Sequence, residues 1–412
     1  MRTLSFLLIA VFVLQALKAE ENWPQFRGPQ GNGHSEAKNL PTEWGETKNI
    51  KWKTAIHGKG WSSPVIWKDQ IWLTTATEDG KKMSVLCIDA ESGKIERDFV
   101  VFENEEPQFC HESNSYASPT PAIEEGRLYV HFGAFGTACL DTQSGKVLWS
   151  RRDFKCDHFR GPASSPILVG DLLFVPYDGF DVQYVVALDK NTGKTVWKKD
   201  RNIDYGTSNG DHFKAYSTAH AITVDGKPQI VSPSATETIA YRPENGDVIW
   251  RVRHGGMNAA CRPLYEHGMV YISAGDGGDS LVAVKADGKG DVTDSHLVWK
   301  TGKTVPKRSS QLIVGDLFFM VNDSGVATCL DAKTGKVHWQ KRLEGEFWAS
   351  PLHADGKIYC LSKQGLAVVF AAKPAFELIA ENQLDAGANA SLAVIGNDLI
   401  LRSFTHLYRI GE

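Results

Sequence analysis

Short runs of alternating apolar and polar residues recur along the chain and predict β-strands throughout. One repeat shows the pattern, with strands expected over 117–123, 127–132, 137–141 and 146–149. Alternation with a period of two is typical of strands with one buried face, and the Gly or Asp-Gly pairs between the runs suit tight hairpins. The chain after its first twenty residues shows almost no helical periodicity. The sequence therefore predicts an all-β protein built from four-stranded antiparallel units.

A ten-residue phrase recurs between the third and fourth strands of these units. It stands at 140–149, 188–197 and 330–339, and a weaker copy ends at Trp250. In each full copy an Asp precedes Ser-Gly or Thr-Gly, and a Trp follows. We expect the Asp to cap turn amides, the Gly to supply a positive φ and the Trp to pack between neighbouring units. The residues assigned this structural role are Asp141, Gly145, Trp149, Asp189, Gly193, Trp197, Gly246, Trp250, Trp299, Asp331, Gly335 and Trp339.

The first strands of the repeats give the number of units. They begin near Ser62, Ser118, Ser164, Ser217, Cys261, Ser309, Ser350 and Ser391, spaced by about forty to fifty-five residues, as in β-propeller blades. The eighth unit has no room for a fourth strand, whereas 50–54 resembles a fourth strand without a blade. We therefore expect one eight-bladed β-propeller over 50–412, with the N-terminal strand completing the last blade and closing the ring. Seven blades with one unit misread is the alternative.

Composition and the N-terminal sequence indicate which ligands and which cellular location to expect. The 412 residues include 45 Lys and Arg and 49 Asp and Glu, so the chain lacks the basic surface of a nucleic-acid-binding protein. Residues 1–19 resemble a signal peptide, because Arg2 precedes an apolar run that is too short to span a bilayer and ends near the small residues Ala16 and Ala19. We expect an exported, soluble monomer, periplasmic or extracellular, without a membrane span. Residues 20–49 should form an extension that packs on the propeller.

The repeated phrase resembles the pyrroloquinoline-quinone-like (PQQ-like) β-propeller repeat family. The matching positions are Ala187, Asp189, Thr192, Gly193 and Trp197, and the resemblance covers nearly the whole exported chain. The family includes quinone-dependent alcohol dehydrogenases and non-catalytic envelope proteins. The chain has no Cys-Cys pair, no Cys-x-x-Cys-His haem motif and no recognisable calcium-binding set, so the resemblance does not imply bound PQQ here. It implies a BamB-like propeller without a lipid-bearing cysteine.

Three consecutive connectors should meet on the face at which the first strands begin, here called the top face. They contain Cys110–Tyr116, Cys156–Gly161 and Gly210–Tyr216, and the last two share Asp-His-Phe followed by Arg or Lys. His111, Asp157, His158, Asp211 and His212 have side chains suited to zinc, and calcium is a second possibility for a divalent metal.

A second interpretation of the top face is a funnel for an acidic or sugar-like ligand. Arg160, Lys214, Arg262 and Arg308 would supply charge, and Trp348 would supply a stacking surface. The third interpretation is that the Asp and His side chains only brace the loops. The complete candidate set is His111, Glu112, Asn114, Asp157, His158, Arg160, Asp211, His212, Lys214, Arg262, Arg308 and Trp348.

The seven cysteines are an odd number, so they cannot all pair within the chain. Cys110 and Cys156 begin equivalent loops on adjacent blades, and an exported protein can carry disulfides. We expect these two to form a bridge, and two free thiols are the alternative.

These patterns favour a non-catalytic scaffold of the bacterial envelope over an enzyme. We expect a scaffold of the outer-membrane protein assembly type. The partner would be an envelope protein or an extended ligand on the top face, and we expect no cofactor. The alternative is a quinoprotein-like or metal-dependent enzyme that uses the His and Asp cluster. The sequence presents no nucleophile or activated water for such an enzyme.

Overall fold

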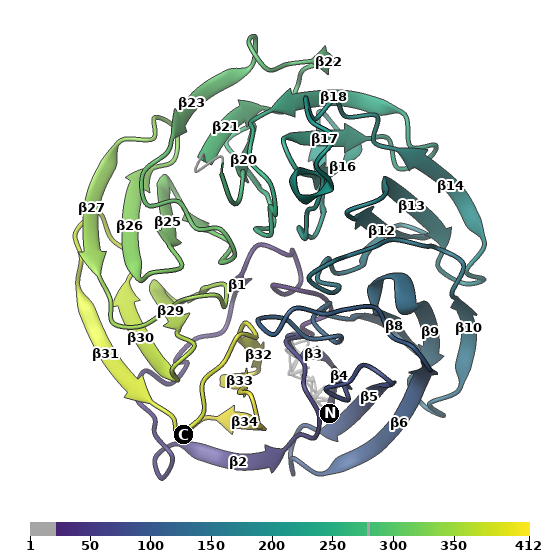
Figure 1. The fold of residues 1–412 in the computed structure, drawn as a ribbon. Helices are drawn as coiled ribbons and strands as arrows, with labels where there is room; N and C mark the ends of the chain where they lie inside the picture. The colour runs from purple at the N-terminus through teal and green to yellow at the C-terminus, as the bar shows by residue number, and fades with distance from the viewer. Residues whose placement is uncertain (1–21, 278–280) are drawn as a thin grey trace, which may run out of the picture.

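Eight blades surround a central axis, so the predicted eight-bladed β-propeller is confirmed (Figure 1). The structure is a computed structural model that describes residues 22–277 and 281–412; the predicted signal segment 1–19 lies outside these ranges. Within them, no helix is both long and apolar enough to cross a membrane. The two helices of the described residues are single 3-10 turns, η1 (Gly133–Phe135) and η2 (Gly210–His212).

The first four blades follow one another along the chain, and each contains four antiparallel strands. The first contains β3 (Val65–Trp67), β4 (Gln70–Ala76), β5 (Lys82–Asp89) and β6 (Ile95–Glu103). The second contains β7 (Ala122–Glu124), β8 (Arg127–His131), β9 (Thr137–Asp141) and β10 (Val147–Arg151). The third contains β11 (Ile167–Val169), β12 (Leu172–Asp178), β13 (Gln183–Asp189) and β14 (Thr195–Asp200). The fourth contains β15 (His220–Val224), β16 (Lys227–Pro233), β17 (Glu237–Tyr241) and β18 (Val248–Arg253).

The last four blades continue the series, and short extra strands widen two of the eight sheets. The fifth contains β19 (Leu264–Glu266), β20 (Met269–Ser273), β21 (Leu281–Lys285) and β23 (Leu297–Thr301). The sixth contains β24 (Leu312–Val314), β25 (Leu317–Val321), β26 (Val326–Asp331) and β27 (Val337–Arg342). The seventh contains β28 (Leu352–Ala354), β29 (Lys357–Leu361), β30 (Leu366–Ala371) and β31 (Leu378–Gln383). The extra strands are β22 (Gly290–Asp291), parallel to β18, and β1 (His34–Ser35), parallel to β28.

The ring is closed by β2 (Ile50–Ala55), as the sequence predicted. It pairs antiparallel with β34 (His406–Ile410), which continues through β33 (Asp398–Arg402) to β32 (Ala393–Ile395). The eighth blade therefore combines strands from both ends of the chain. Closure leaves no blade of the ring without a neighbour, so the sheet faces that the end blades of an open array would expose are covered.

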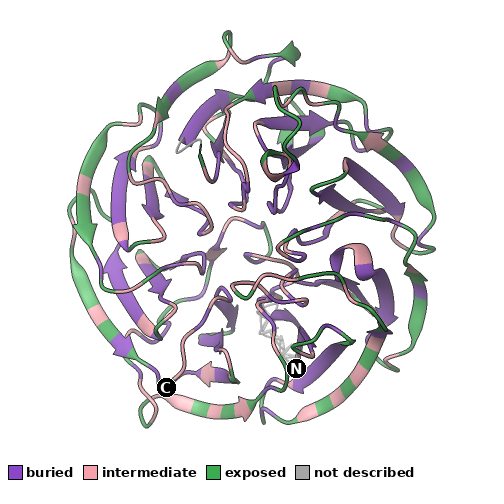
Figure 2. Ribbon diagram, viewed as in Figure 1, coloured by how far each residue is buried: buried purple, intermediate pink, exposed green. Residues whose placement is uncertain are grey.

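Burial differs between the inner and outer strands of each blade (Figure 2). The second and third strands are almost wholly buried, as in β12 and β13, because both of their faces pack against adjacent blades. The fourth strands face solvent on one side, so β6 alternates between exposed and half-buried residues. All eight blades carry a register shift between the third and fourth strands, which increases the local twist.

The recurring Asp-Thr-Gly turn receives the Trp of the preceding blade. Asp189 Oδ1 accepts hydrogen bonds from the Thr192 amide and hydroxyl, each at 2.8 Å. Gly193 has a φ of 69°, and a Cβ there would lie 2.6 Å from the Trp149 ring. The Trp149 indole N–H donates to the Lys190 carbonyl at 2.9 Å. The same relation joins Trp197 to Gly246.

Two further tryptophans of the predicted set differ in whether they pack against the turn glycine of the next blade. Trp299 packs against Gly335 and donates its indole N–H to the Ala332 carbonyl at 2.8 Å. Trp250 differs, because its N–H donates to Gln229 Oε1 of its own blade at 2.9 Å. The strand β22 lies beside it, whereas Trp149, Trp197 and Trp299 each lie beside a turn glycine of the next blade.

The N-terminal extension crosses the propeller from the first blade to the seventh (Figure 1). Trp23 is buried and exchanges two main-chain hydrogen bonds with Ile66. The segment then passes the axis, where Arg27 Nη2 donates to the Gln311 carbonyl, and reaches β28 through β1. Trp44 is buried near the seventh blade, and its amide donates to Asn382 Oδ1 at 2.8 Å. The extension thus obstructs the central channel.

Candidate functional site: the axial funnel of the top face

One residue from each blade lines the channel at the top face. It stands four positions before the first strand of the blade, and its eight occupants are Trp61, Ser118, Ala163, Tyr216, Ala260, Arg308, Trp348 and Asn389. All eight contribute to a cavity of about 120 Å³ that has Phe26 of the extension among its lining residues. A connected upper cavity of about 180 Å³ adds residues from the longer connectors. We call the two cavities together the axial funnel.

A ring of hydroxyl groups holds these eight positions in register. It is formed two residues after each funnel position, where seven blades carry Ser or Thr and the fifth carries Arg262. Seven of the eight main-chain amides at these positions donate to the hydroxyl of the next blade, at 2.9–3.0 Å. The donor–acceptor pairs are Ser63–Thr120, Thr120–Ser165, Ser165–Thr218, Arg262–Ser310, Ser310–Ser350, Ser350–Ser391 and Ser391–Ser63. The repeat therefore places its funnel residues at the same height around the axis.

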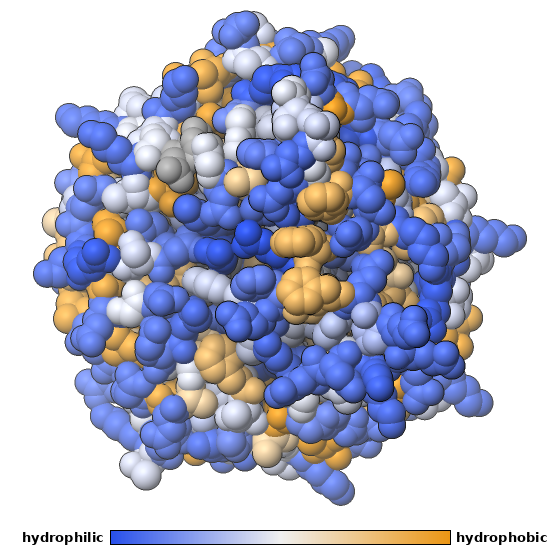
Figure 3. Space-filling view, in the orientation of Figure 1, coloured by the Kyte–Doolittle hydropathy of each residue, from blue (hydrophilic) through white to orange (hydrophobic). Residues whose placement is uncertain are grey.

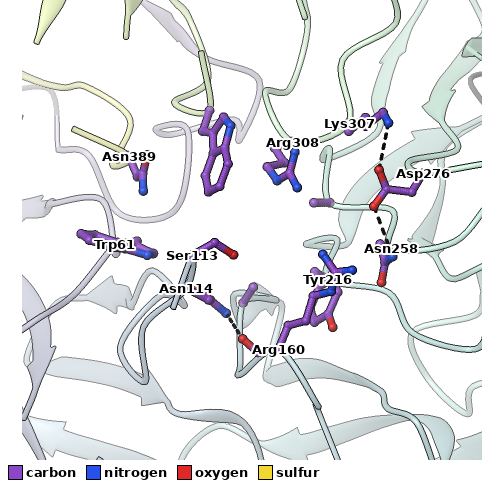
Figure 4. Close-up of a pocket in the computed structure, with 13 residues that line it drawn as sticks. Trp61, Ser113, Asn114, Arg160, Tyr216, Asn258, Asp276, Lys307, Arg308 and Asn389 are labelled. Carbon is purple, nitrogen blue, oxygen red and sulfur yellow. Dashed lines mark hydrogen bonds and ion pairs between the residues drawn. The ribbon is translucent and has the colours of Figure 1, made fainter. Parts of the chain in front are cut away.

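The upper cavity is lined by aromatic, amide and charged side chains (Figure 4). Trp348 is flanked by two cations, with Arg308 Cζ 4.3 Å and Lys363 Nζ 4.2 Å from its ring centre. Trp61 lies across the cavity from Tyr216 and packs against Phe404 with 5.0 Å between ring centres. Flat aromatic faces and cations together suit planar or ring-shaped ligand groups and carboxylates.

The cations of the funnel differ in how far their charge is compensated. Lys307 pairs with Asp276 at 3.1 Å, and Arg308 pairs with Asp323. Arg160 makes no ion pair with any residue of the described ranges, although its main-chain carbonyl accepts from Asn114 Nδ2 at 2.9 Å. The Arg160 guanidinium is thus the positive charge in the funnel that is available to an anionic group.

Four buried polar atoms at the funnel have no partner within the described part of the chain. They are Arg160 Nε, Trp61 Nε1, Asn258 Oδ1 and Asn389 Oδ1. Two of these are donors and two are acceptors. Buried polar groups are normally satisfied, so an unpartnered set that surrounds a cavity indicates a bound polar species with both donors and acceptors.

An apolar patch lies beside the funnel on the same face (Figure 3). Phe109, Phe159 and Phe180 are 63 %, 40 % and 40 % exposed and come from three separate loops. Their rings are in contact, with centroids 6.1 Å apart for Phe109–Phe159 and 6.0 Å for Phe159–Phe180. We call these three residues the aromatic ridge. Other exposed large apolar residues of the described ranges lie on the outer strands, so the ridge is the apolar feature of the top-face loops.

Four of the twelve predicted ligand residues line the funnel: Asn114, Arg160, Arg308 and Trp348. Lys214 lies elsewhere, fully buried under the ridge with its Nζ 4.2 Å from the Phe159 ring centre, and it pairs with Asp211. Arg262 points into the channel and donates to the Phe26 carbonyl at 2.6 Å. The four cationic residues that were predicted to line one funnel therefore lie at three separate places.

The predicted metal cluster is not assembled. Among residues 22–277 and 281–412 there is no group of three or more His, Cys, Asp and Glu that could hold a metal ion. His158 is buried and its Nε2 accepts from the Ala134 amide at 3.0 Å, while burial lowers its pKa to about 4. His212 is exposed on η2, and His111 lies in a separate small pocket with its Nδ1 2.8 Å from Ser113 Oγ. Glu112 and Asp157 are exposed.

The predicted disulfide is a second correction. All seven cysteines lie in the described ranges and all are free thiols. Cys110 Sγ contacts the Arg160 carbonyl at 3.5 Å, whereas Cys156 is buried with its Sγ 3.7 Å from His158 Nδ1. The two sulfurs are thus held by different partners, although their loops occupy equivalent places on adjacent blades.

Sequence reasoning found Asn114 and Trp348 but missed the other aromatic and amide residues of the funnel. Trp61, Tyr216, Asn258 and Asn389 were not among the candidates, nor were Ser113, Ala163, Ala260, Asp276 and Lys307. A signal was available: the alignment of the Ser and Thr openers identifies the position two residues before each hydroxyl of the ring.

The residues of the funnel do not fit a calcium–quinone pair, which the PQQ-like resemblance raises. Calcium takes six to eight oxygen ligands, mostly from several carboxylates and carbonyls. The described funnel residues offer one carboxylate, Asp276, which already pairs with Lys307 and accepts from Asn258 Nδ2 at 3.2 Å. The donor set therefore supports ligand binding through aromatic, amide and guanidinium groups.

Relatives of the chain include assembly factors and quinoprotein dehydrogenases. The outer membrane protein assembly factor BamB of Legionella pneumophila (strain Paris) is 25% identical over 212 residues, 50% of this chain and 49% of the relative. The quinoprotein alcohol dehydrogenase PedH of Pseudomonas putida is 28% identical over 197 residues, 45% of this chain and 29% of the relative. The chain thus spans less than half the length of either curated relative.

Solved structures share the fold at low sequence identity. BamB from Moraxella catarrhalis superposes with a TM-score of 0.60 at 13% identity, covering 88% of this chain and 99% of that one. A europium-containing methanol dehydrogenase gives 0.70 at 11% identity, covering 92% and 89%. The family profile described as outer membrane protein assembly factor BamB matches residues 37–175, 181–307 and 290–375. Most of the propeller is thus matched by that profile, and the chain belongs to this family.

Proposed function

We propose that this protein is an exported, non-catalytic scaffold of the bacterial envelope that binds an extended segment of a partner protein on its top face. The observation that carries the proposal is the aromatic ridge beside a funnel with unpartnered polar atoms. Exposed contiguous apolar patches on otherwise soluble surfaces are typical of interaction sites. Membership of the BamB family supports outer-membrane protein assembly as the process in which such a scaffold would act.

The chemistry of the site favours a polypeptide as the occupant. Arg160 Nε and Trp61 Nε1 require acceptors, and Asn258 Oδ1 and Asn389 Oδ1 require donors. The main chain of an extended segment carries both kinds of group at every residue. An apolar side chain of the segment would rest on the ridge, and a carboxylate would pair with Arg160.

Site-specific photocrosslinking tests this proposal. A photoreactive phenylalanine analogue replaces Phe159 in the protein as exported by its own bacterium, and the expected result is one discrete adduct with an envelope protein. The matched control carries the analogue at Val147, which is 47% exposed on β10 away from the funnel. Arg160→Ala in the Phe159 background should weaken the adduct.

Two results would contradict the proposed binding face. One is the same adduct from Val147 as from Phe159. The other is the absence of an adduct from all three ridge positions when the protein is folded and exported. The quinoprotein-like alternative predicts instead that the purified protein oxidises an alcohol when PQQ and calcium are added. The ligand atoms of the axial funnel give this alternative less support, because among the described residues they include only one carboxylate.

A further inference from the structure

Two buried arginines lie in the lower part of the channel without a carboxylate partner. Arg27, from the extension, and Arg262, from the fifth blade, are each 2% exposed. Within residues 22–277 and 281–412, neither forms an ion pair, and the charge that acts most strongly on Arg27 is that of Arg262. Buried charges are normally paired, so this arrangement lacks an anion.

The hydrogen bonds of the two guanidinium groups are incomplete. Arg262 donates to the Phe26 carbonyl at 2.6 Å and to Gln25 Oε1 at 3.1 Å. Arg27 Nη2 donates to the Asn32 carbonyl at 2.9 Å and to the Gln311 carbonyl. Arg27 Nε and Nη1, Arg262 Nε and both amide atoms of Gln311 have no partner in the described structure. Three guanidinium nitrogens, which carry four N–H groups, are therefore buried and unused.

Arg402 shows that burial alone does not produce this deficit. It is 3% exposed and its Nη1 donates to the Ser62 carbonyl at 3.0 Å and to Ser62 Oγ at 2.6 Å. Burial lowers its pKa to about 9, as it does for Arg27 and Arg262. Arg402 has no buried nitrogen without a partner, in contrast to the other two.

A cavity adjoins Arg262, the first of the two arginines along the path from solvent. It has a volume of about 510 Å³ and lies further along the first strands than the funnel, toward the other mouth of the channel. Its polar lining residues are Gln25, Gln30, Asn32, His220, Thr223, Arg262, Tyr265 and Glu266. The His220 Nδ1 is 2.7 Å from the Pro263 carbonyl oxygen. Because a carbonyl oxygen can only accept a hydrogen bond, His220 carries a proton on Nδ1 and donates it to this oxygen. Arg262 is the one cation among the lining residues described, and the acid, Glu266, is exposed.

The repeat itself marks Arg262 as a departure. Seven blades place a Ser or Thr hydroxyl at this position to accept from the preceding blade, and the fifth blade gives up that hydrogen bond. Gly31 adapts to the change, because it has a φ of 67° and a Cβ there would lie 2.3 Å from the Arg262 guanidinium. The extension is thus shaped around an arginine that the propeller does not require for its own closure.

We propose that the lower cavity binds a small oxyanion, a carboxylate or a phosphate, through Arg262, with Arg27 as the second positive charge behind it. Guanidinium groups bind both anions through paired N–H donors. The amides of Gln25 and Asn32 would contact the remainder of the ligand. This site is separate from the top face, so it stands or fails independently of the proposed function.

Calorimetric titration of the full-length exported protein tests the site, with inorganic phosphate and succinate as the probes at constant ionic strength set by chloride. We expect one site per chain for at least one of the probes, and the better probe identifies the class of oxyanion. Arg262→Gln keeps a side chain that can donate to Phe26 but removes the charge. It should weaken binding about tenfold or more, since hydrogen bonds to charged groups contribute more than 1.4 kcal/mol. Arg402→Gln, the matched control, should bind as the unaltered protein does.

Native mass spectrometry of the unaltered protein provides a measurement that does not depend on the folding of a variant. A phosphate or succinate adduct of one per chain supports the site. Absence of binding by both methods for both probes overturns it, as does equal binding by the Arg262→Gln and unaltered proteins. Saturation by chloride alone also overturns the proposal, because it would show that a simple halide supplies the missing charge.

Discussion

The amide of Ser391 donates to Ser63 Oγ at 3.0 Å, and this contact joins the last blade to the first. It is the closing member of the hydroxyl ring around the axis. Because a hydrogen bond of this kind contributes about 1 kcal/mol, Ser63→Ala should lower the free energy of unfolding by about that amount. Urea denaturation measures the change. Ser150→Ala, at an exposed position of β10, is the control and should leave the midpoint unaltered.

The turn glycines should differ sharply in their tolerance of alanine. Gly193 and Gly170 both have a positive φ, of 69° and 59°, so alanine strains the main chain at either position. At Gly193 the new Cβ would also lie 2.6 Å from the Trp149 ring, whereas at Gly170 nothing lies within 4 Å. Gly193→Ala should therefore be less stable than Gly170→Ala by about 1–3 kcal/mol, the usual cost of overpacking. Equal midpoints in urea for the two variants would refute the interlocking of Trp149 with this turn.

Acid should destabilise the protein through its buried histidines. Burial lowers the pKa of His158 to about 4 and that of His220 to about 3. The unfolded chain takes up these protons below about pH 6.5, whereas the folded protein does not until the pH approaches 4. The free energy of unfolding should thus fall as the pH is lowered from 6.5 to 4, by up to about 1.4 kcal/mol per pH unit for each such histidine.

Single substitutions can assign part of that slope. His158→Gln retains an acceptor for the Ala134 amide and should flatten the pH dependence by the contribution of one histidine. Ser150→Ala, which alters an exposed residue without a titratable group, is the control and should leave the slope unchanged. Urea titrations at several pH values between 4 and 7 provide the comparison, and parallel curves for His158→Gln and the unaltered protein would contradict the assignment.

The thiols offer a direct check of the corrected disulfide. Denaturation without reductant should expose seven free thiols, because no cysteine is paired in the structure. In the folded protein, Cys110 is half-buried and Cys156 is 1% exposed, so a thiol reagent should modify Cys110 first. Burial raises the pKa of Cys110 to about 11, so its reaction should be slow at neutral pH. A count of five free thiols would restore the predicted bridge.

The fold could be predicted from the sequence because its determinants are local and repeated. Asp189, Gly193 and Trp197 each perform a task set by turn geometry, and the same tasks recur in other blades. The closing strand could be predicted for a related reason. The eighth unit lacks a fourth strand, and 50–54 supplies one.

The funnel was predicted only in part, because the prediction rested on charged and metal-binding residue types. Arg160, Arg308 and Trp348 were found, while Tyr216 and Asn389 at equivalent positions were not. Register, more than residue type, decides which side chains reach the axis.

The prediction of a metal cluster was wrong for a different physical reason. The Asp-His-Phe segments of two connectors are equivalent in sequence, yet His158 turns inward to accept from Ala134 and His212 lies exposed on η2. Long connectors are not fixed by the ladder of the sheet, so equivalent residues in them can point in different directions. A repeat determines the position of such a loop but not the orientation of its side chains.

The pairing of β2 with β34 has a consequence for how the molecule is made. The eighth blade needs a strand from residues 50–55 and three strands from residues 393–410, so it cannot form until residues 393–410 have been synthesised. Until then, β2 has no β34 strand to pair with. The final sheet therefore forms only when the strands from both ends of the propeller are present, and a chain that lacks either set of strands cannot complete the ring.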